Sequence, residues 1–172
     1  MQAIILAAGM GKRLKELTSD NTKCMVKVNG VTLIERMLRQ IERQNVSRIV
    51  VVTGYQGQKL RDYIETLGIK TPFVFIDNPI YDKTNNIYSL ALASDKLCEE
   101  DTLLFESDLI FEDSILDALV QDPRPTLALV DKYEAWMDGT CVKLTADDCI
   151  DAFIPGKKII FDQTNEYYKT VN

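Results

Sequence analysis

Histidine is absent from the 172 residues of this chain. Without an imidazole, Ser-His-Asp and Cys-His catalysis are excluded. The cysteines form no Cys-x-x-Cys pair, although zinc sites usually contain closely spaced ligand pairs. We therefore expect reduced cysteines that mostly pack as small apolar residues, at Cys24, Cys98, Cys141 and Cys149. What remains is catalysis by carboxylates, lysines and arginines, for which we expect a metal.

Long apolar runs and blocks of basic residues are also missing. The apolar runs are shorter than the ~18–20 residues needed to span a bilayer. Residues 1–6 lack the basic region and the long apolar stretch of a signal peptide, so a cytoplasmic protein is expected. The formal net charge of −6 argues against nucleic acid and anionic membranes as partners. Phosphate groups, if bound, must meet a few local cations.

Apolar runs alternate with helical patterns along the chain. Buried strands are predicted at residues 3–6, 48–53, 73–76, 102–105 and 126–130. Helices are predicted at residues 32–41, 59–67, 87–97 and 114–120, the first opened by a capping box at Thr32 and Glu35. This alternation predicts an α/β fold of the Rossmann-like, three-layer α/β/α kind with a mostly parallel sheet.

The length fits a single domain over residues 1–172. After residue 130 the alternation stops, and short strands are expected at residues 142–144 and 150–153. The chain ends in a strand-like run, so we expect the domain to lack its C-terminal part. Such a piece would expose a sheet edge, which favours self-association. Fusion to further domains in the full-length protein stays open.

A glycine loop follows the first predicted strand. Its residues are Leu6, Ala7, Ala8, Gly9, Met10, Gly11, Lys12, Arg13 and Leu14. Glycines let the backbone turn tightly and bring N–H groups against phosphate oxygens. A Walker loop is excluded because Arg13 follows Lys12 where serine or threonine is required. A dinucleotide site would need a third glycine, which Leu14 replaces. A Gly-x-Gly alone is also compatible with a structural turn.

The full string, followed by Thr22-Lys23 before an apolar segment and a helix, resembles the signature of the nucleotidyltransferase family. This family includes hexose-1-phosphate nucleotidyltransferases and phosphocholine cytidylyltransferases, and usually carries Pro-Lys where this chain has Thr22-Lys23. The resemblance covers nearly the whole chain in element order. It implies the nucleotide-diphospho-sugar transferase fold and a Mg²⁺-dependent transfer of a nucleotidyl group to a small phosphorylated metabolite.

The resemblance also implies roles for individual residues. Arg13 and the backbone of the glycine loop, assisted by Lys12, would hold the β- and γ-phosphates of an NTP, and Lys23 would contact the α-phosphate and the incoming phosphate. Asp108, just after a predicted strand, would hold Mg²⁺, for which carboxylate oxygen is suited. The family's second metal aspartate has no obvious counterpart here, and Glu106 is a candidate supporting carboxylate. The alternative for Lys23 is a solvated loop lysine without a catalytic role. The alternative for Asp108 is a turn or helix-start residue that binds no metal.

Two further segments bear on the substrates. Residues 84–90, Thr-Asn-Asn-Ile-Tyr-Ser-Leu, resemble the phosphocholine cytidylyltransferase branch and lie where the family contacts base and ribose. Asn85 and Ser89 are therefore expected to hydrogen-bond the base, although an asparagine here can equally cap the helix. Tyr133, Trp136 and Asp138 could hold an ammonium group by cation–π contact and charge, although a lone tryptophan often only packs.

These observations together predict a cytidylyltransferase that uses CTP and phosphocholine or a similar small alcohol phosphate. Two alternatives remain at this stage. One is a sugar-1-phosphate nucleotidyltransferase that uses UTP, dTTP or GTP. The other is a non-catalytic, nucleotide-binding regulatory domain with the same fold.

Overall fold

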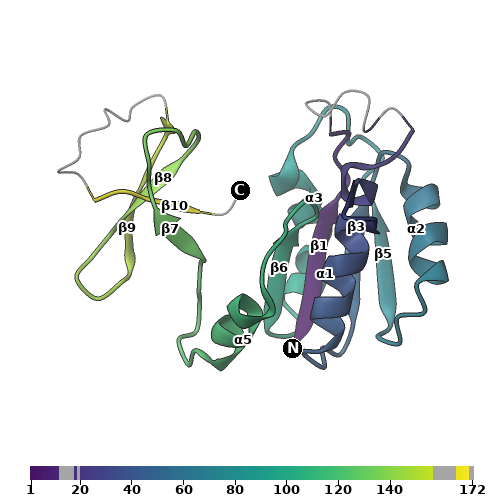
Figure 1. Cartoon of the computed structure of the whole chain (residues 1–172), viewed down its shortest axis with the longest axis horizontal. Helices are drawn as coiled ribbons and strands as arrows, with labels where there is room; N and C mark the ends of the chain where they lie inside the picture. Colours follow the sequence, from purple (N-terminus) through teal and green to yellow (C-terminus); the bar gives the residue numbers. More distant parts are fainter. Residues whose placement is uncertain (12–17, 19, 157–165, 171–172) are drawn as a thin grey trace. The chain divides into compact units, whose positions relative to one another are not determined.

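The computed structural model describes residues 1–11, 18, 20–156 and 166–170. The chain divides into two compact units, Met1–Gln121 and Asp122–Asn172 (Figure 1). Each unit has its own sheet and is considered by itself. The single domain expected over the whole length stays a prediction.

The first unit is built on a four-stranded parallel sheet with the strand order β5-β4-β1-β6. Its strands are β1 (Gln2–Ala7), β4 (Ile49–Thr53), β5 (Phe73–Asp77) and β6 (Thr102–Glu106). Every residue of the central strands β1 and β4 is buried, as expected of parallel strands that are covered on both faces. Four of the five strands predicted from apolar runs are therefore confirmed, each to within about two residues.

Five α-helices are described in this unit. They are α1 (Leu33–Glu42), α2 (Gly57–Thr66), α3 (Asn86–Leu92), α4 (Ser94–Leu97) and α5 (Asp113–Gln121). A short 3-10 helix, η2 (Lys23–Met25), and a hairpin of β2 (Lys27–Val28) and β3 (Val31–Thr32) precede α1. The helix predicted over residues 87–97 is divided at Ala93 into α3 and α4. At the start of α1, Thr32 Oγ1 accepts a hydrogen bond from the Glu35 N–H at 3.1 Å, which confirms the predicted cap.

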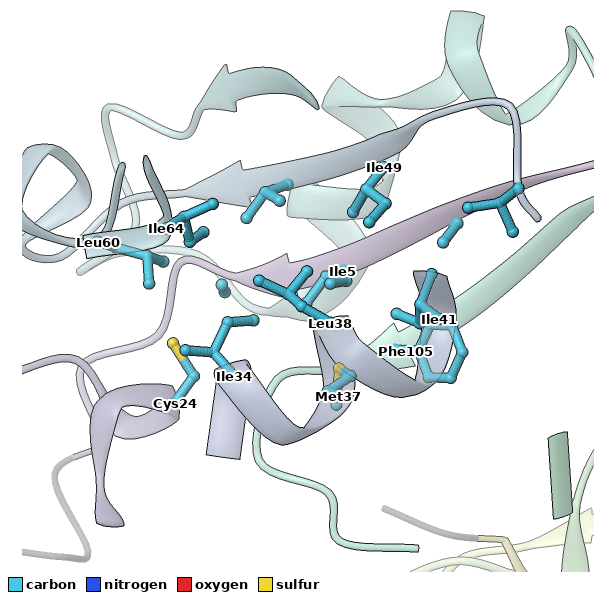
Figure 2. Packing of buried hydrophobic residues seen from close by; sticks show 14 of the residues in the cluster. Ile5, Cys24, Ile34, Met37, Leu38, Ile41, Ile49, Leu60, Ile64 and Phe105 are labelled. Carbon is cyan, nitrogen blue, oxygen red and sulfur yellow. The ribbon is translucent and has the colours of Figure 1, made fainter. Parts of the chain in front are cut away.

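Two apolar clusters show that the helices cover both faces of the sheet. Ala3, Ile5 and Ala7 of β1 pack in one cluster with residues of α1, α2 and α5. Ile4 and Leu6, which alternate with them, pack in the other with residues of α3 and α4. Figure 2 shows the larger cluster, with buried side chains of α1 directed at the strands. The expected three-layer α/β/α arrangement is thus confirmed.

The second unit is an antiparallel sheet with the strand order β7-β10-β8-β9. Its strands are β7 (Val130–Lys132), β8 (Cys141–Leu144), β9 (Ile150–Ile154) and β10 (Tyr168–Thr170). The fifth strand expected over residues 126–130 is wrong, because the strand begins at Val130 and pairs antiparallel with β10. An apolar run indicates burial but does not specify the partner strand. In the part of the chain that the structure describes, every helix is too short or too polar to cross a membrane.

Candidate functional site

The strand order of the parallel sheet locates the candidate site. From β1 the chain proceeds to β4 and β5 on one side, and then returns to β6 on the other side of β1. Ligands of open α/β sheets bind beyond the carboxyl ends of the strands, where the order reverses in this way. In this sheet that point lies between β1 and β6. The loop after β1 and the residues after β6 therefore form the candidate site.

The loop after β1 is packed directly against Lys23. Gly11 has a φ of 62°, in the left-handed region that favours glycine. A Cβ at Gly11 would lie 3.0 Å from Lys23 Cβ and 3.0 Å from Thr18 Cγ2, and Thr18 Oγ1 donates a hydrogen bond of 3.1 Å to the Gly11 carbonyl. At Gly9, by contrast, a Cβ would meet none of the described atoms within 4 Å. Among the described residues, the loop is thus closed toward Lys23 and open at Gly9.

Lys23 and Asp108 form an ion pair at this point of the sheet. The residues on either side of Lys23, Thr22 and Cys24, are buried, and the Thr22 Oγ1–Cys24 Sγ hydrogen bond spans 3.0 Å. Burial raises the pKa of the Cys24 thiol to about 11, so this cysteine is protonated and unreactive at neutral pH. Thr22 and Cys24 therefore anchor the segment, while Lys23 reaches the carboxylate that the sequence selected as the metal ligand.

Glu106 is a second carboxylate next to Asp108. Its pKa is raised by burial and by the nearby Asp108 charge, while the Asn86 hydrogen bond and Lys23 act in the opposite direction. Asn86 Nδ2 donates to Glu106 Oε1 at 2.8 Å and to Oε2 at 2.9 Å. This contact joins the first residue of α3 to the last residue of β6. The sequence pattern indicates a helix cap for an asparagine in this segment and does not predict the contact of Asn86 with Glu106.

The residues expected to contact the base, Asn85 and Ser89, differ in exposure to solvent. Ser89 is only 3% exposed, and its Oγ accepts a hydrogen bond of 3.1 Å from Asn78 Nδ2. Asn78, which sequence reasoning missed, also donates to Thr84 Oγ1 at 3.0 Å. This hydrogen bond holds the loop that precedes α3. Asn85 is exposed, and within the described residues its side chain does not cap α3. It lies in an open depression lined by Asp82, Lys83, Thr84, Asn85 and Tyr88.

The residues proposed for an ammonium group belong to the second unit. Trp136 is 77% exposed, and its Nε1 donates a hydrogen bond to Glu134. Among the described residues, Trp136 is therefore not part of a core. Tyr133 Oη donates to the Met137 carbonyl at 2.7 Å, and Asp138 Oδ1 accepts from the Gly139 N–H at 2.7 Å. Lys12 and Arg13 of the glycine loop lie outside the described residues.

Glu106 and Asp108 are the carboxylates available to a metal at the site. In residues 1–11, 18, 20–156 and 166–170, no group of three or more acidic, cysteine or histidine side chains could hold a metal ion. Mg²⁺ is usually bound by one or two protein carboxylates together with water and substrate phosphates. The residues present therefore fit a Mg²⁺ ion that arrives with a nucleotide, and do not form a cage made of protein alone.

Gly54, at the end of β4, lets the chain approach the glycine loop closely. A Cβ there would lie 2.8 Å from the Ala8 carbonyl oxygen and 2.7 Å from Tyr81 Cβ. We expect Gly54→Ala to lower the free energy of unfolding by about 1–3 kcal/mol, because a backbone atom cannot move aside cheaply. Urea unfolding measures this change, and Ser94→Ala at an exposed position of α4 is the control. An unchanged midpoint for Gly54→Ala would show that the contact is relieved elsewhere.

A glycine loop held against a lysine, at the switch point of a parallel sheet and opposite a carboxylate, defines a phosphate-binding α/β domain. Residues 3–146 match the MobA-like NTP transferase domain, and the chain belongs to this family. The family resemblance identified from the glycine loop is thereby confirmed.

Individual relatives agree with this assignment. The chain is 33% identical over 137 residues to the CTP:phosphoglutamine cytidylyltransferase of Campylobacter jejuni, covering 77% of this chain and 53% of the relative. It is 36% identical over 115 residues to the choline-phosphate cytidylyltransferase of Haemophilus influenzae, covering 67% and 47%. The chain thus spans about half the length of these two relatives.

The fold is shared with a solved structure of CTP:phosphocholine cytidylyltransferase from Streptococcus pneumoniae. The TM-score is 0.68 at 24% identity, and the match covers 90% of this chain and 64% of that one. The α/β fold of the nucleotidyltransferases, expected from the sequence, is confirmed by this likeness.

Proposed function

We propose that this chain supplies the nucleotide site of a cytidylyltransferase, which transfers CMP from CTP to phosphocholine or a similar small alcohol phosphate and releases pyrophosphate. The observation that carries the proposal is the Lys23–Asp108 pair beside the glycine loop, at the switch point of the parallel sheet. The family supports NTP as a substrate. The relatives named above are cytidylyltransferases, which supports CTP and a phosphorylated acceptor.

The reaction joins two anions, so its main requirement is positive charge at the reacting phosphates. In the proposal, an oxygen of the acceptor phosphate attacks the α-phosphorus of CTP. The bond from that phosphorus to the bridging β-phosphate oxygen breaks, and pyrophosphate leaves with the bonding electrons. Lys23 contacts both the α-phosphate and the acceptor phosphate and stabilises the charge that develops between them. Its pairing with Asp108 holds the ammonium group at the site before the phosphates bind.

The β- and γ-phosphates of CTP bind at the glycine loop in this proposal. Backbone N–H groups of residues 9–11, together with Lys12 and Arg13, hold the β- and γ-phosphates in this proposal. Asp108 would hold Mg²⁺, which would neutralise phosphate charge when bound. In this proposal Asp108 would serve both the ammonium group of Lys23, with which it pairs, and the metal.

The acceptor is proposed to carry a positively charged nitrogen. Trp136 presents an exposed ring, and Tyr133 and Asp138 lie close to it in the sequence. An exposed aromatic face attracts an ammonium group by about 0.5–1 kcal/mol. The choline-phosphate relative is named for an acceptor of this kind. A sugar phosphate, which lacks an ammonium group, would gain no cation–π attraction from these side chains.

Pyrophosphate release by the full-length protein tests the proposal. Each of the four NTPs is combined, in the presence of Mg²⁺, with phosphocholine, aminoalkyl phosphates and glucose-1-phosphate. Release only with CTP and an amino-alcohol phosphate is the expected result. Release with a sugar phosphate would instead assign a sugar-1-phosphate nucleotidyltransferase. Nucleotide binding without release from any pair would indicate the regulatory alternative.

A further inference from the structure

Glu106 is a charged side chain whose position calls for an explanation. It is the last residue of β6, it lies on the α3 side of the sheet, and it is partly buried. Asn86 donates to both of its carboxylate oxygens, at 2.8 and 2.9 Å. Placing a carboxylate partly out of water is costly unless it receives hydrogen bonds, and this contact supplies them. The contact therefore fixes the orientation of the Glu106 carboxyl group.

The negative charge of Glu106 also has to be compatible with the ligand of the site. If the site accepts a polyphosphate, the charge of Glu106 repels it, in addition to the charge of Asp108. The repulsion is offset if Glu106 accepts hydrogen bonds from a part of the ligand that donates them. In a nucleotide these parts are the hydroxyl groups of the ribose and the amino group of some bases. An anion with free acceptor capacity is suited to either of them.

The neighbours of Glu106 indicate that the ribose, and not the base, supplies the hydrogen-bond donors to it. One neighbour is Asp108, which pairs with Lys23 next to the glycine loop, where the phosphates are proposed to bind. A second neighbour is Asn86, which is adjacent to Asn85 in the segment expected to contact the base. The ribose joins the base to the phosphates covalently. The part of the nucleotide between these two regions is therefore the sugar.

We propose that Glu106 is a specificity residue for the ribose of the nucleotide, its carboxylate accepting hydrogen bonds from the ribose hydroxyls, and that Asn86 positions it. The inference rests on the proposed function, because it requires a nucleotide at the switch point. An ionised carboxylate has about four acceptor positions, so the single amide nitrogen of Asn86 leaves room for a ribose diol. The same chemistry, a carboxylate on a ribose hydroxyl, recurs in dinucleotide-binding folds.

The test compares CTP with 2′-deoxy-CTP, both with Mg²⁺, by titration calorimetry on the full-length protein. The wild type is expected to bind CTP more tightly by roughly tenfold or more, as for a hydrogen bond to a charged group. Glu106→Ala is expected to bring the ratio of the two dissociation constants close to one. Asn86→Ala is expected to lower the ratio by a smaller factor, because the carboxylate remains but is no longer held.

A matched control exists elsewhere in the same unit. Gln44 Nε2 donates to Asp117 Oδ1 at 2.8 Å, which is also an amide–carboxylate contact between distant segments. Asp117→Asn is expected to leave the ratio for CTP and 2′-deoxy-CTP at the wild-type value. A fall in the ratio in this variant would mean that general loosening of the fold lowers it, and would overturn the assignment of Glu106.

The remaining outcomes are distinguishable. Equal loss of CTP and 2′-deoxy-CTP binding in Glu106→Ala, with a higher Mg²⁺ requirement, would overturn the ribose role and make Glu106 a metal ligand. An unchanged ratio with unchanged CTP affinity would also overturn it. Failure of the wild type to bind CTP at all would contradict the proposed function itself, and the inference with it.

Discussion

Replacing Asp108 with asparagine is expected to lower kcat/KM of the full-length protein by a factor of about 10² to 10³, as for other groups that stabilise transition-state charge. Asparagine has almost the same shape but no charge to offer a metal or the Lys23 ammonium group. Lys23→Ala is expected to have an effect of similar size, because the α-phosphate and the incoming phosphate lose their shared cation. Pyrophosphate release with CTP and the accepted acceptor measures both variants.

The fold should survive these substitutions. The side chains of Lys23 and Asp108 are about 30% exposed, so their ion pair is screened by water and contributes at most about 1 kcal/mol to stability. Circular dichroism and urea unfolding check this expectation. Asp95→Asn, an exposed carboxylate in α4, is the control and should keep wild-type kinetics. If Asp108→Asn or Lys23→Ala turned over at the wild-type rate, the role assigned to that residue would be wrong.

Ile34→Ala should lower the free energy of unfolding by about 2–5 kcal/mol, the range for isoleucine removed from a packed core. Ile34 is 0% exposed and lies in α1, within the larger apolar cluster against the sheet. Figure 2 shows it near Cys24, which anchors the segment carrying Lys23. A loss of this size is a large part of the ~5–15 kcal/mol that typically stabilises a domain.

An exposed isoleucine provides the matched control for the core substitution. Ile87 is also in a helix, α3, but is 68% exposed. Ile87→Ala should therefore change the free energy of unfolding by less than about 0.5 kcal/mol. Chemical unfolding followed by circular dichroism compares the two variants. Equal destabilisation by both would mean that α1 does not pack on the sheet as described.

The structural features that follow from a local sequence pattern could be predicted from the sequence. Parallel strands buried on both faces appear as continuous apolar runs, so β1 and β4 could be predicted directly. The cap at Thr32 is a local hydrogen bond and could also be predicted. Lys23 and Asp108 were selected through the family signature, and the structure brings them together. Their catalytic roles stay predictions.

Contacts between distant segments could not be predicted in the same way. The Asn86–Glu106 contact depends on how α3 lies against the end of β6, which no local pattern encodes. The buried hydrogen bond from Asn78 to Ser89 likewise depends on the path of the loop between them. The run at residues 126–130 shows the converse, since its apolar character predicted a strand that begins only at Val130.

Label transfer from CTP tests the central claim most directly. The full-length protein is given CTP labelled at either the α- or the γ-phosphate, with Mg²⁺ and the accepted phosphorylated acceptor. Nucleotidyl transfer predicts that the α-label appears in the acceptor product and that the γ-label leaves as pyrophosphate. Label from the γ-phosphate in the acceptor, or in free orthophosphate alone, would show phosphoryl transfer or hydrolysis and would contradict the account.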